Sequence, residues 1–302
     1  MKINLSNKKA LVGGSSKGLG YAVAKQLASC GAIVTMVSRN ESLLKKNIIE
    51  LKKLTGNDHN YILVDYNNTK KYKEIIDDFF KTNSVDILIN NTQGPPAGDV
   101  LSVSELDYEN TFNLLFQNTI STSMAALKGM KKNGWGRIIN MTSVSVKEPL
   151  SYLALSNTIR SAVTSWGKTL SIESGKYNIT VNNILTGFFN TERLKELNSE
   201  KAKKFNIETD EVFQKMSEMV PMKRIGEPEE FGYLVAFLSS EYANYINGVN
   251  IPIDGGLLKS MWKNYFKVTV LSEGLKGVSI KFPEASINSS LIFISPFGKP
   301  LI

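Results

Sequence analysis

Short apolar runs alternate with longer amphipathic stretches along most of this chain. The apolar runs predict strands at Lys9–Val12, Ile33–Ser38, Asn60–Asp65, Ile87–Asn90, Arg137–Thr142, Ile179–Leu185 and Val249–Ile253. The stretches between them predict helices near Tyr21–Ser29, Ser42–Leu54, Lys70–Lys81, Leu106–Lys131, Leu155–Ser174 and Glu229–Leu238. Strands that alternate with helical crossovers predict an α/β fold. We expect a Rossmann-type, doubly wound parallel sheet of about seven strands with helices on both faces.

Two segments depart from this alternation. Residues 192–220 are charged and helical in pattern, and they separate the sixth predicted strand from Pro221. The tail, residues 259–302, holds alternating runs separated by Gly, Pro and Asn, which predict short β-strands. We therefore expect a Rossmann domain over residues 1–258 and a C-terminal extension over residues 259–302.

A glycine-rich turn follows the first predicted strand and precedes the first predicted helix. Its sequence is Gly14-Ser15-Ser16-Lys17-Gly18-Leu19-Gly20. Glycines let the backbone approach a pyrophosphate closely, and the following helix presents free N–H groups and the positive end of its dipole. The order strand, turn, helix therefore predicts a phosphate-binding loop, and a tight turn without a ligand is the alternative.

The charges near this turn bear on which dinucleotide binds. A site that prefers a free ribose 2′-hydroxyl places an acidic residue at the end of the second strand. This chain has Arg39 there, and Lys17 lies inside the turn. Two cations suit a 2′-phosphate, so we predict NADP(H) rather than NAD(H). The alternative for Arg39 is a solvated charge at a strand end.

Composition narrows the class of protein. The chain has 302 residues, 42% hydrophobic and 21% charged, as is ordinary for a soluble globular protein. No apolar run approaches the length of a membrane span, and the first residues lack the apolar stretch of a signal peptide, so we expect a cytoplasmic protein with no membrane partner. Cys30 is the only cysteine and His59 the only histidine. An intrachain disulfide, a metal site built on cysteines and a Ser-His-Asp mechanism are therefore not expected.

The net charge of +8 does not by itself indicate a nucleic-acid partner. Residues 259–302 contain six lysines and two glutamates and so contribute +4 of this charge. The remainder is spread among mixtures of lysine and glutamate, without a basic cluster interleaved with aromatic residues. We interpret this charge as a lysine-rich solvated surface and expect no nucleic-acid binding.

Further motifs follow the glycine turn in order. Asp65-Tyr66 ends the third predicted strand, Asn90-Asn91-Thr92-Gln93 follows the fourth, Thr186-Gly187-Phe188-Phe189-Asn190-Thr191 follows the sixth, and Asn247-Gly248 precedes Asp254-Gly255-Gly256. Together with the spacing Gly-x-x-x-Gly-x-Gly, these motifs resemble the short-chain dehydrogenase/reductase family over about residues 5–258.

The resemblance implies a set of cofactor-binding residues. They are Gly14, Ser16, Lys17, Gly18, Leu19, Gly20, Arg39, Asp65, Tyr66, Asn91, Gly187 and Thr191. The motifs depart from the family at Gln93, which replaces a glycine, and at Thr186, which replaces a proline. The resemblance also implies that residues 192–220 form a mobile lid over the substrate. A surface helix pair with no gating role is the alternative.

The catalytic positions match the family least well. The family combines hydride transfer with proton transfer by a tyrosine, supported by a lysine four residues later, a serine and an asparagine. Ser143 fills the serine position, whereas Ser156 replaces the tyrosine and Arg160 the lysine. The asparagine position holds Leu115, with Asn118 nearly one turn beyond. A serine hydroxyl is a poorer acid than a phenol, and arginine stays protonated.

Two functions are compatible with these residues. The pattern Ser-Asn-x-x-Arg resembles a divergent subgroup labelled 3-oxoacyl-acyl-carrier-protein reductase-like. It implies an NADP(H)-dependent oxidoreductase acting on a small-molecule carbonyl or alcohol, an acyl thioester among them, with Ser143, Ser156 and Arg160 at the reacting oxygen. The alternative is a nucleotide-binding protein that kept the fold and lost turnover. Tyr152 would supply a phenol if its helix began early enough to include it.

The resemblance further implies a homodimer or homotetramer. Family members pair through the long helices that correspond to residues 106–131 and 155–174. The second of these carries Ile159, Ala162, Val163 and Trp166 at helical spacing. These side chains are suited to an interface between subunits, and they are equally suited to packing on the sheet.

Overall fold

The predicted strands lie side by side in one sheet. The computed structural model describes residues 2–260, except for the side chains of residues 204 and 205, and within this part seven parallel strands pair in the order β3-β2-β1-β4-β5-β6-β7. They are β1 (Lys9–Gly13), β2 (Ile33–Ser38), β3 (Asn60–Leu63), β4 (Ile87–Asn90), β5 (Gly136–Met141), β6 (Ile179–Thr186) and β7 (Asn250–Ile253). The strands predicted in the tail lie beyond residue 260, outside the described residues.

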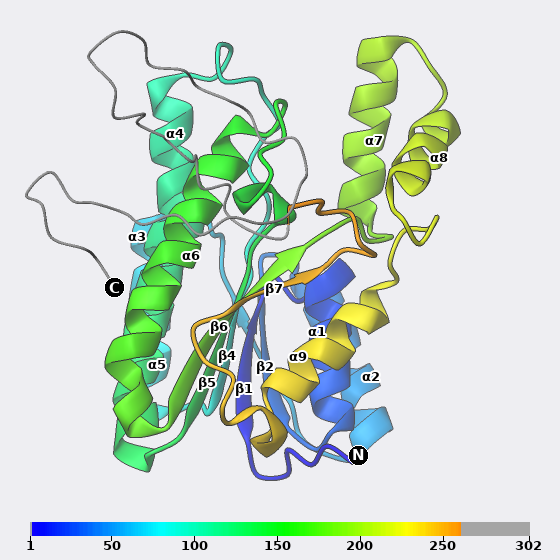
Figure 1. The fold of residues 1–302 in the computed structure, drawn as a ribbon. Coiled ribbons are helices and arrows are strands. Elements are labelled where there is room, and N and C mark those ends of the chain that lie inside the picture. Colours follow the sequence, from blue (N-terminus) through cyan, green and yellow to red (C-terminus); the bar gives the residue numbers. More distant parts are fainter. Residues whose placement is uncertain (1, 261–302) are drawn as a thin grey trace, which may run out of the picture. The chain divides into compact units, whose positions relative to one another are not determined.

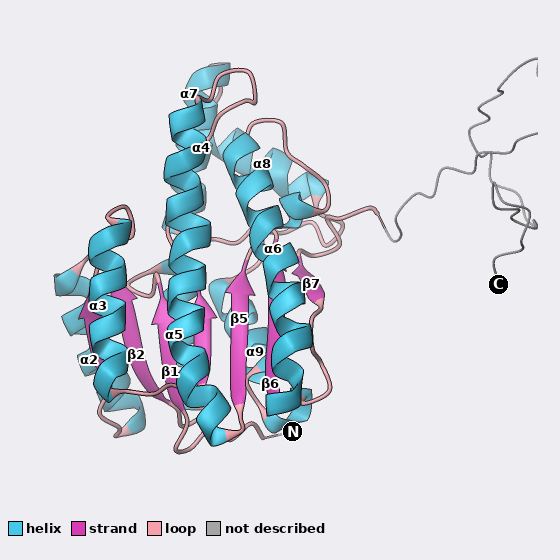
Figure 2. Cartoon of the chain, turned by 90° about the vertical axis from the view of Figure 1, so that its left-hand side faces the viewer, coloured by secondary structure: helices cyan, strands magenta, loops and turns pink. Residues whose placement is uncertain are grey.

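Helices cover both faces of the sheet. One face carries α1 (Gly18–Ser29), α2 (Glu41–Thr55) and α9 (Pro228–Leu238), and the other carries α3 (Thr69–Thr82), α5 (Asn118–Asn133) and α6 (Ala154–Ser174) (Figures 1 and 2). All six residues of β5 are buried, as are the four of β4. Strands buried on both faces have continuous apolar sequences, which explains why their bounds could be predicted. The doubly wound α/β fold is confirmed.

The helix predicted over residues 106–131 is interrupted. It consists of α4 (Glu105–Thr111), a π-helical turn (Phe112–Gln117) and α5. The amide of Asn118 bonds to the carbonyl of Asn113, five residues back. A π turn leaves carbonyl groups without their usual α-helical partner. Here the side chains of Asn118 and Thr119 donate to the carbonyls of Leu114 and Leu115, at 3.2 and 2.7 Å.

A chain of four asparagine side chains crosses the sheet, which we call the amide chain. Asn90, Asn140, Asn183 and Asn250 lie in register on β4, β5, β6 and β7. Each amide nitrogen donates to the oxygen of the next residue, over 2.8, 2.8 and 2.7 Å. Asn90, Asn140 and Asn183 are buried, and bonding along the chain removes most of the cost of burying them.

Two helices stand beyond the carboxyl ends of the strands (Figures 1 and 2). They are α7 (Glu192–Phe205) and α8 (Thr209–Met219), and they correspond to the helical segment predicted at residues 192–220. Thr191 caps α7 by accepting from the amide of Leu194 at 3.3 Å. A small core of its own, centred on Ala202, Val212 and Met216, holds the two helices together.

Candidate functional site

The candidate site lies where the strand order reverses. The chain runs outward from β1 through β2 to β3 and then returns to β4 on the other side of β1. The connections after β1 and β4 therefore diverge and leave a crevice at the carboxyl ends of these strands, where doubly wound sheets bind their ligands. The predicted site residues lie in the connections at this edge of the sheet or on α1 and α6.

The glycines of the turn allow close approach of backbone to backbone. A Cβ atom at Gly13 would lie 2.3 Å from the carbonyl oxygen of Asn91, and one at Gly20 would lie 2.2 Å from that of Gly14. Gly14 and Gly18 also have positive φ angles, of 53° and 59°. Larger residues would be strained or excluded at these positions. The side-chain amide of Asn91 donates to the carbonyl of Gly13 at 3.1 Å. This bond joins the segment after β4 to the start of the turn.

The start of α1 offers unpaired donors next to this turn. Lys17 is the N-cap residue, and its side chain does not cap the helix. The amides of Gly18, Leu19 and Gly20 belong to the first turn, where no carbonyl of the same helix can reach them. A glycine-rich turn followed by a helix start without a side-chain cap fits the diphosphate of a dinucleotide. We call residues 13–20, which form these two parts, the dinucleotide cradle.

The turn is held firmly to the second strand and the second helix. Ser38 donates to Ser16 between their hydroxyl groups at 2.8 Å, and the Asn47 side chain donates to the carbonyl of Ser16 at 2.9 Å. Ser15 accepts from the amide of Val37 at 2.9 Å. Ser16 is therefore part of a rigid framework, which preorganises the loop for a ligand.

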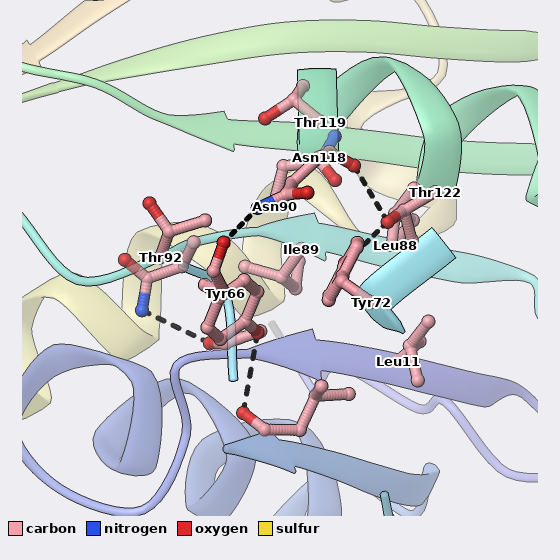
Figure 3. A pocket seen from close by; sticks show the side chains of 13 residues that line it. Leu11, Tyr66, Tyr72, Leu88, Ile89, Asn90, Thr92, Asn118, Thr119 and Thr122 are labelled. Atoms are coloured by element: carbon pink, nitrogen blue, oxygen red, sulfur yellow. Dashed lines mark hydrogen bonds between the residues drawn. The ribbon is translucent and has the colours of Figure 1, made fainter. Parts of the chain in front are cut away.

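Tyr66 is buried beneath the turn. Its hydroxyl accepts from the amide of Gly14 at 3.0 Å, and its ring lies 5.1 Å from that of Tyr72. Dashed lines in Figure 3 join Tyr66 to Asn118 and Tyr72 to Thr122, at 2.8 and 2.6 Å. Burial raises the pKa of Tyr66 well above its usual value. The side chain thus supports the turn from below. A contact between Tyr66 and the cofactor remains a prediction.

The charged groups predicted to meet the adenosine end lie at the surface. Arg39 is exposed at the end of β2 and forms no ion pair within the described residues. The Lys17 ammonium lies 3.5 Å from a carboxylate oxygen of Glu196 on α7, and both side chains are more than half exposed. The exposed Asp65 accepts from the amide of Asn67 at 3.0 Å.

Gln93, which replaces the family's glycine, forms an unpredicted contact. Its side-chain amide donates to the Asn67 side chain at 2.8 Å, so it connects the segment after β4 to the segment after β3. On the other side of the site, Thr191 lies next to Gly18, where its Cγ2 would be 3.6 Å from an added Cβ. Gly187 leaves no room for a Cβ, which would lie 2.7 Å from Asp254.

The three predicted catalytic residues lie around the ends of β5 and α6. Ser143 follows β5, and its Oγ accepts from the amide of Ser145 at 3.1 Å. Ser156 is buried in the first turn of α6, and Arg160 follows one turn later. The Nε–H of Arg160 donates to the Oγ of Ser156 at 3.2 Å. Its Nη1 donates to the carbonyl of Met141, at the end of β5, at 2.8 Å.

Arg160 carries a positive charge without a carboxylate partner among the described residues. Burial lowers the pKa of its guanidinium to about 10, so the group stays protonated at neutral pH. It lines a small pocket together with Asn90, Thr92, Leu115, Thr119, Met141, Thr142 and Val163. A partly buried cation beside polar groups favours a ligand that accepts hydrogen bonds or carries negative charge.

The remaining candidates do not replace the missing groups. Leu115 lies in the π turn, and the Asn118 side chain donates to the carbonyls of Leu114 and Tyr66. Helix α6 begins at Ala154, so Tyr152 precedes the helix and does not share a helical face with Ser156. The condition under which Tyr152 would take the tyrosine position is therefore not met.

Besides the ion pair between Glu196 and Lys17, charged side chains of helix α7 contact the rest of the domain at two further places. Arg193 donates to the carbonyl of Pro95 at 3.1 Å and lies 3.6 Å from Glu196. Eight residues later, the ammonium of Lys201 lies 5.3 Å from the ring centre of Tyr152. No motif predicted these contacts, because the direction in which a surface helix points is determined by its packing.

Two further features, a metal cluster and a membrane-spanning helix, were sought among the described residues. Among them, no cluster of three or more histidine, cysteine, aspartate or glutamate side chains could hold a metal ion. None of the helices in the described part combines the length and the apolar character that a membrane span requires.

Comparison with known proteins agrees with this geometry. The family model described as enoyl-(acyl carrier protein) reductase matches residues 14–258. The 3-oxoacyl-[acyl-carrier-protein] reductase FabG of Aquifex aeolicus is 30% identical over 262 residues, which span 85% of this chain and all of the relative. The NADPH-dependent reductase BacG of Bacillus subtilis is 32% identical over 263 residues, with the same coverage.

A solved structure extends the comparison to three dimensions. The L-sorbose reductase of Gluconobacter frateurii, complexed with NADPH and L-sorbose, superposes with a TM-score of 0.81 at 28% identity. The match covers 86% of this chain and all of that one. Fold, motif order and relatives agree, and the chain belongs to the short-chain dehydrogenase/reductase family.

Proposed function

We propose that this protein is an NADP(H)-dependent oxidoreductase that interconverts a small-molecule carbonyl compound and its alcohol. The observation that carries the proposal is the hydrogen bond from Arg160 to Ser156 beside an intact dinucleotide cradle. The NADPH named for BacG and for the complex of the sorbose reductase supports the cofactor. The FabG relatives place acyl thioesters among the candidate substrates.

The residues of the cradle fit the cofactor. The amides of Gly18, Leu19 and Gly20 would bind the diphosphate, and Arg39 and Lys17 the 2′-phosphate. Thr191 would reach the nicotinamide end, since it lies against Gly18 at the start of α7. Bound NADPH would supply a hydride to the carbonyl carbon.

Ser156 and Arg160 would then act on the carbonyl oxygen as a pair. Because Arg160 donates to the Oγ of Ser156, the serine's own proton is free to be donated to another acceptor. The guanidinium also lowers the energy of negative charge that develops on the oxygen. Arginine keeps its proton at neutral pH, so the proton that Ser156 gives up must be replaced from water. The Ser143 hydroxyl would be a second donor, because its oxygen already accepts from Ser145.

A nucleotide-binding protein without turnover is the second candidate. Leu115 favours it, because an apolar side chain at the position of the family's asparagine cannot support a proton-relay water. Under this alternative the cradle still binds NADP(H), and Arg160 only anchors the ligand.

A turnover screen separates the two candidates. Oxidation of NADPH is followed with a panel of ketones, aldehydes and short acyl thioesters, and binding of NADPH is titrated in parallel. We expect the Ser156→Ala variant to lower kcat by about 10²- to 10³-fold, the usual effect of losing one donor to a developing oxyanion. Ser161→Ala is the matched control, since Ser161 lies on the same helix and its hydroxyl donates to the carbonyl of Asn157, within the helix itself.

The outcomes of this screen are distinct. Tight NADPH binding with no turnover of any compound supports the second candidate. Turnover that is the same in Ser156→Ala as in the parent protein removes Ser156 from the mechanism.

We also propose a gating role for α7 and α8 and an assembly of two or four copies. Both helices stand over the carboxyl edge of the sheet, as a lid does, and α7 contacts the domain at Pro95 and Tyr152. Ile159 and Val163 are buried within the chain itself, whereas Met124 and Ile172 on α5 and α6 are 50% and 71% exposed. The assembly would use this outer surface of the two helices. Light scattering at micromolar concentration tests it, and a monomer would refute it.

A further inference from the structure

Helix α7 presents one side to the domain beneath it. Arg193 and Lys201 make the two contacts described above, and they are separated by eight residues, or about 12 Å along a helix. Leu197 lies midway between them at a spacing of four residues, so the three side chains share a face. This face spans from the segment after β4 to the segment before α6, the helix that carries Ser156 and Arg160.

The segments below this face are joined to each other. The amide of Gly98 donates to the carbonyl of Tyr152 at 2.9 Å, and the amide of Ala154 donates to the carbonyl of Gly98 at 3.1 Å. Tyr152 is thereby held two residues ahead of α6 and four ahead of Ser156. The contact between Lys201 and Tyr152 therefore lies on the segment that leads directly into the proposed catalytic pair.

Two groups at this contact are suited to an anion. The Lys201 ammonium is partly buried over the ring and has no carboxylate partner among the described residues. The Tyr152 hydroxyl likewise has no hydrogen-bond partner in the described part of the chain, and burial raises the pKa of this phenol, so it remains a donor at neutral pH. The ammonium lies over the ring that carries this hydroxyl, so one contact holds a cation and a neutral O–H donor, two kinds of group that bind oxyanions.

Two nearby carboxylates are engaged elsewhere. Both the Lys259 and Ser260 amides donate to Glu148, at 2.9 and 2.7 Å. Glu196 lies next to Lys17 and Arg193. Neither acid neutralises Lys201, while Arg160 contributes a further positive charge deeper in the site. Lys201 and Arg160 are the cations that we expect a negatively charged substrate to meet.

We propose that the substrate carries a carboxylate or phosphate group, which Lys201 and Tyr152 bind while its carbonyl reaches Ser156 and Arg160. The proposal rests on the proposed oxidoreductase function and specifies the class of carbonyl compound. Lys201 is then a specificity-determining residue on α7, and Tyr152 binds the anion instead of donating the catalytic proton.

The test compares charged and uncharged versions of the same ketone. Oxo acids with one to five carbons between the two carbonyl groups are assayed beside their methyl esters and beside phosphorylated ketones. We expect the best anionic substrate to exceed its uncharged partner at least tenfold in kcat/KM, and the series to distinguish carboxylate from phosphate. Lys201→Gln should raise KM for that substrate at least tenfold and leave the ester unchanged. Lys203→Gln, an exposed lysine on the same helix, is the control.

A binding measurement keeps this proposal separate from the proposed function. Calorimetric titration of the parent protein and the two variants with the matching hydroxy acids and their esters needs no turnover. Hydroxy acids that bind in a Lys201-dependent way without any catalysis would support the anion site and contradict the oxidoreductase. Turnover with equal preference for acid and ester, or equal behaviour of the Lys201 and Lys203 variants, would overturn the anion site.

Discussion

The Nε–H of Arg160 donates to the Oγ of Ser156 across one turn of α6, at 3.2 Å. We predict that this pair takes the positions of the family's tyrosine and lysine, with the later cation supporting the earlier hydroxyl. The same guanidinium also bonds to Met141 at the end of β5, which fixes the pair against the sheet.

Replacing Arg160 by lysine should disrupt this pair although the charge remains. Lysine has no planar fork, so it cannot bond to Ser156 and to the carbonyl of Met141 at the same time. We expect weaker NADPH binding and a loss of turnover of about tenfold or more, measured by titration and steady-state kinetics. Unchanged values for both would show that the fork has no function.

The double variant Ser156→Tyr with Arg160→Lys recreates the family's own pair. We expect it to gain reduction of simple ketones, because a phenol is a stronger acid than a serine hydroxyl and a lysine can support it. Ser156 is only 7% exposed, so room for the ring is the critical condition. Loss of folding or of NADPH binding in this variant would show that the pocket is built around serine and arginine.

Arg39 should determine the choice of cofactor. Its exposed guanidinium and the ammonium of Lys17 are expected to meet the 2′-phosphate, so NADPH should bind at least about tenfold more tightly than NADH, or ~1.4 kcal/mol. Arg39→Asp should reverse this order, because a carboxylate repels the phosphate and accepts from the free ribose. Equal affinities of the parent protein for the two cofactors would refute the assignment.

His59 should make stability depend on pH. The amide of Val34 donates to its Nδ1 at 3.1 Å, and its Nε2 lies 2.9 Å from the Thr55 hydroxyl, an arrangement that suits the neutral ring. Burial lowers the pKa of His59 below its usual 6.5. The unfolded chain therefore takes up a proton first as pH falls through 6.5, and stability decreases until the folded pKa is passed.

Urea unfolding between pH 7.5 and 5.5 measures this effect. The slope cannot exceed about 1.4 kcal/mol per pH unit for a single group. The carboxylates with lowered pKa values, such as Glu230 at about 2, titrate below this range. His59→Gln keeps a neutral polar side chain and should remove the slope. A slope of equal size in that variant would exclude His59 as its source.

Gly167 should be sensitive to even a single added methyl group. It lies on α6 against the amide chain, and a Cβ there would approach the side-chain amides of Asn140 and Asn183 to 2.8 Å. These amides bond to each other on paired strands and have little freedom to move apart. Gly167→Ala should therefore lower the free energy of unfolding by about 1–3 kcal/mol in urea, despite the higher helix propensity of alanine. Ser165→Ala, at an exposed site on the same helix, should stay within about 0.5 kcal/mol.

The layers of the fold and much of the site could be predicted from the sequence. Strands covered on both faces are mostly apolar, and a glycine turn between strand and helix has few other uses. The break at Phe112–Gln117 could not be predicted, because a π turn depends on where Asn118 and Thr119 donate rather than on residue periodicity. Tyr66 was predicted at the cofactor, and only the structure shows that its ring supports the turn from below.

The contacts of α7 with Lys17 and Tyr152 also escaped prediction. Charged residues on a surface helix are compatible with many orientations, and nothing in their spacing identifies the partner. The amide chain could not be predicted for a related reason. Its four residues are spread over 160 positions, and only the strand register brings them together.

The amide chain has an evolutionary consequence. Its hydrogen bonds run in one direction across four strands, so a change at Asn90, Asn140 or Asn183 leaves a neighbour with an unmet donor or acceptor inside the sheet. Substitutions at Asn90, Asn140, Asn183 and Asn250 should therefore occur as sets, in which a loss on one strand is accompanied by a compensating change on the next. Relatives that diverge at one of these positions alone should be rare, even where the rest of the sheet varies freely.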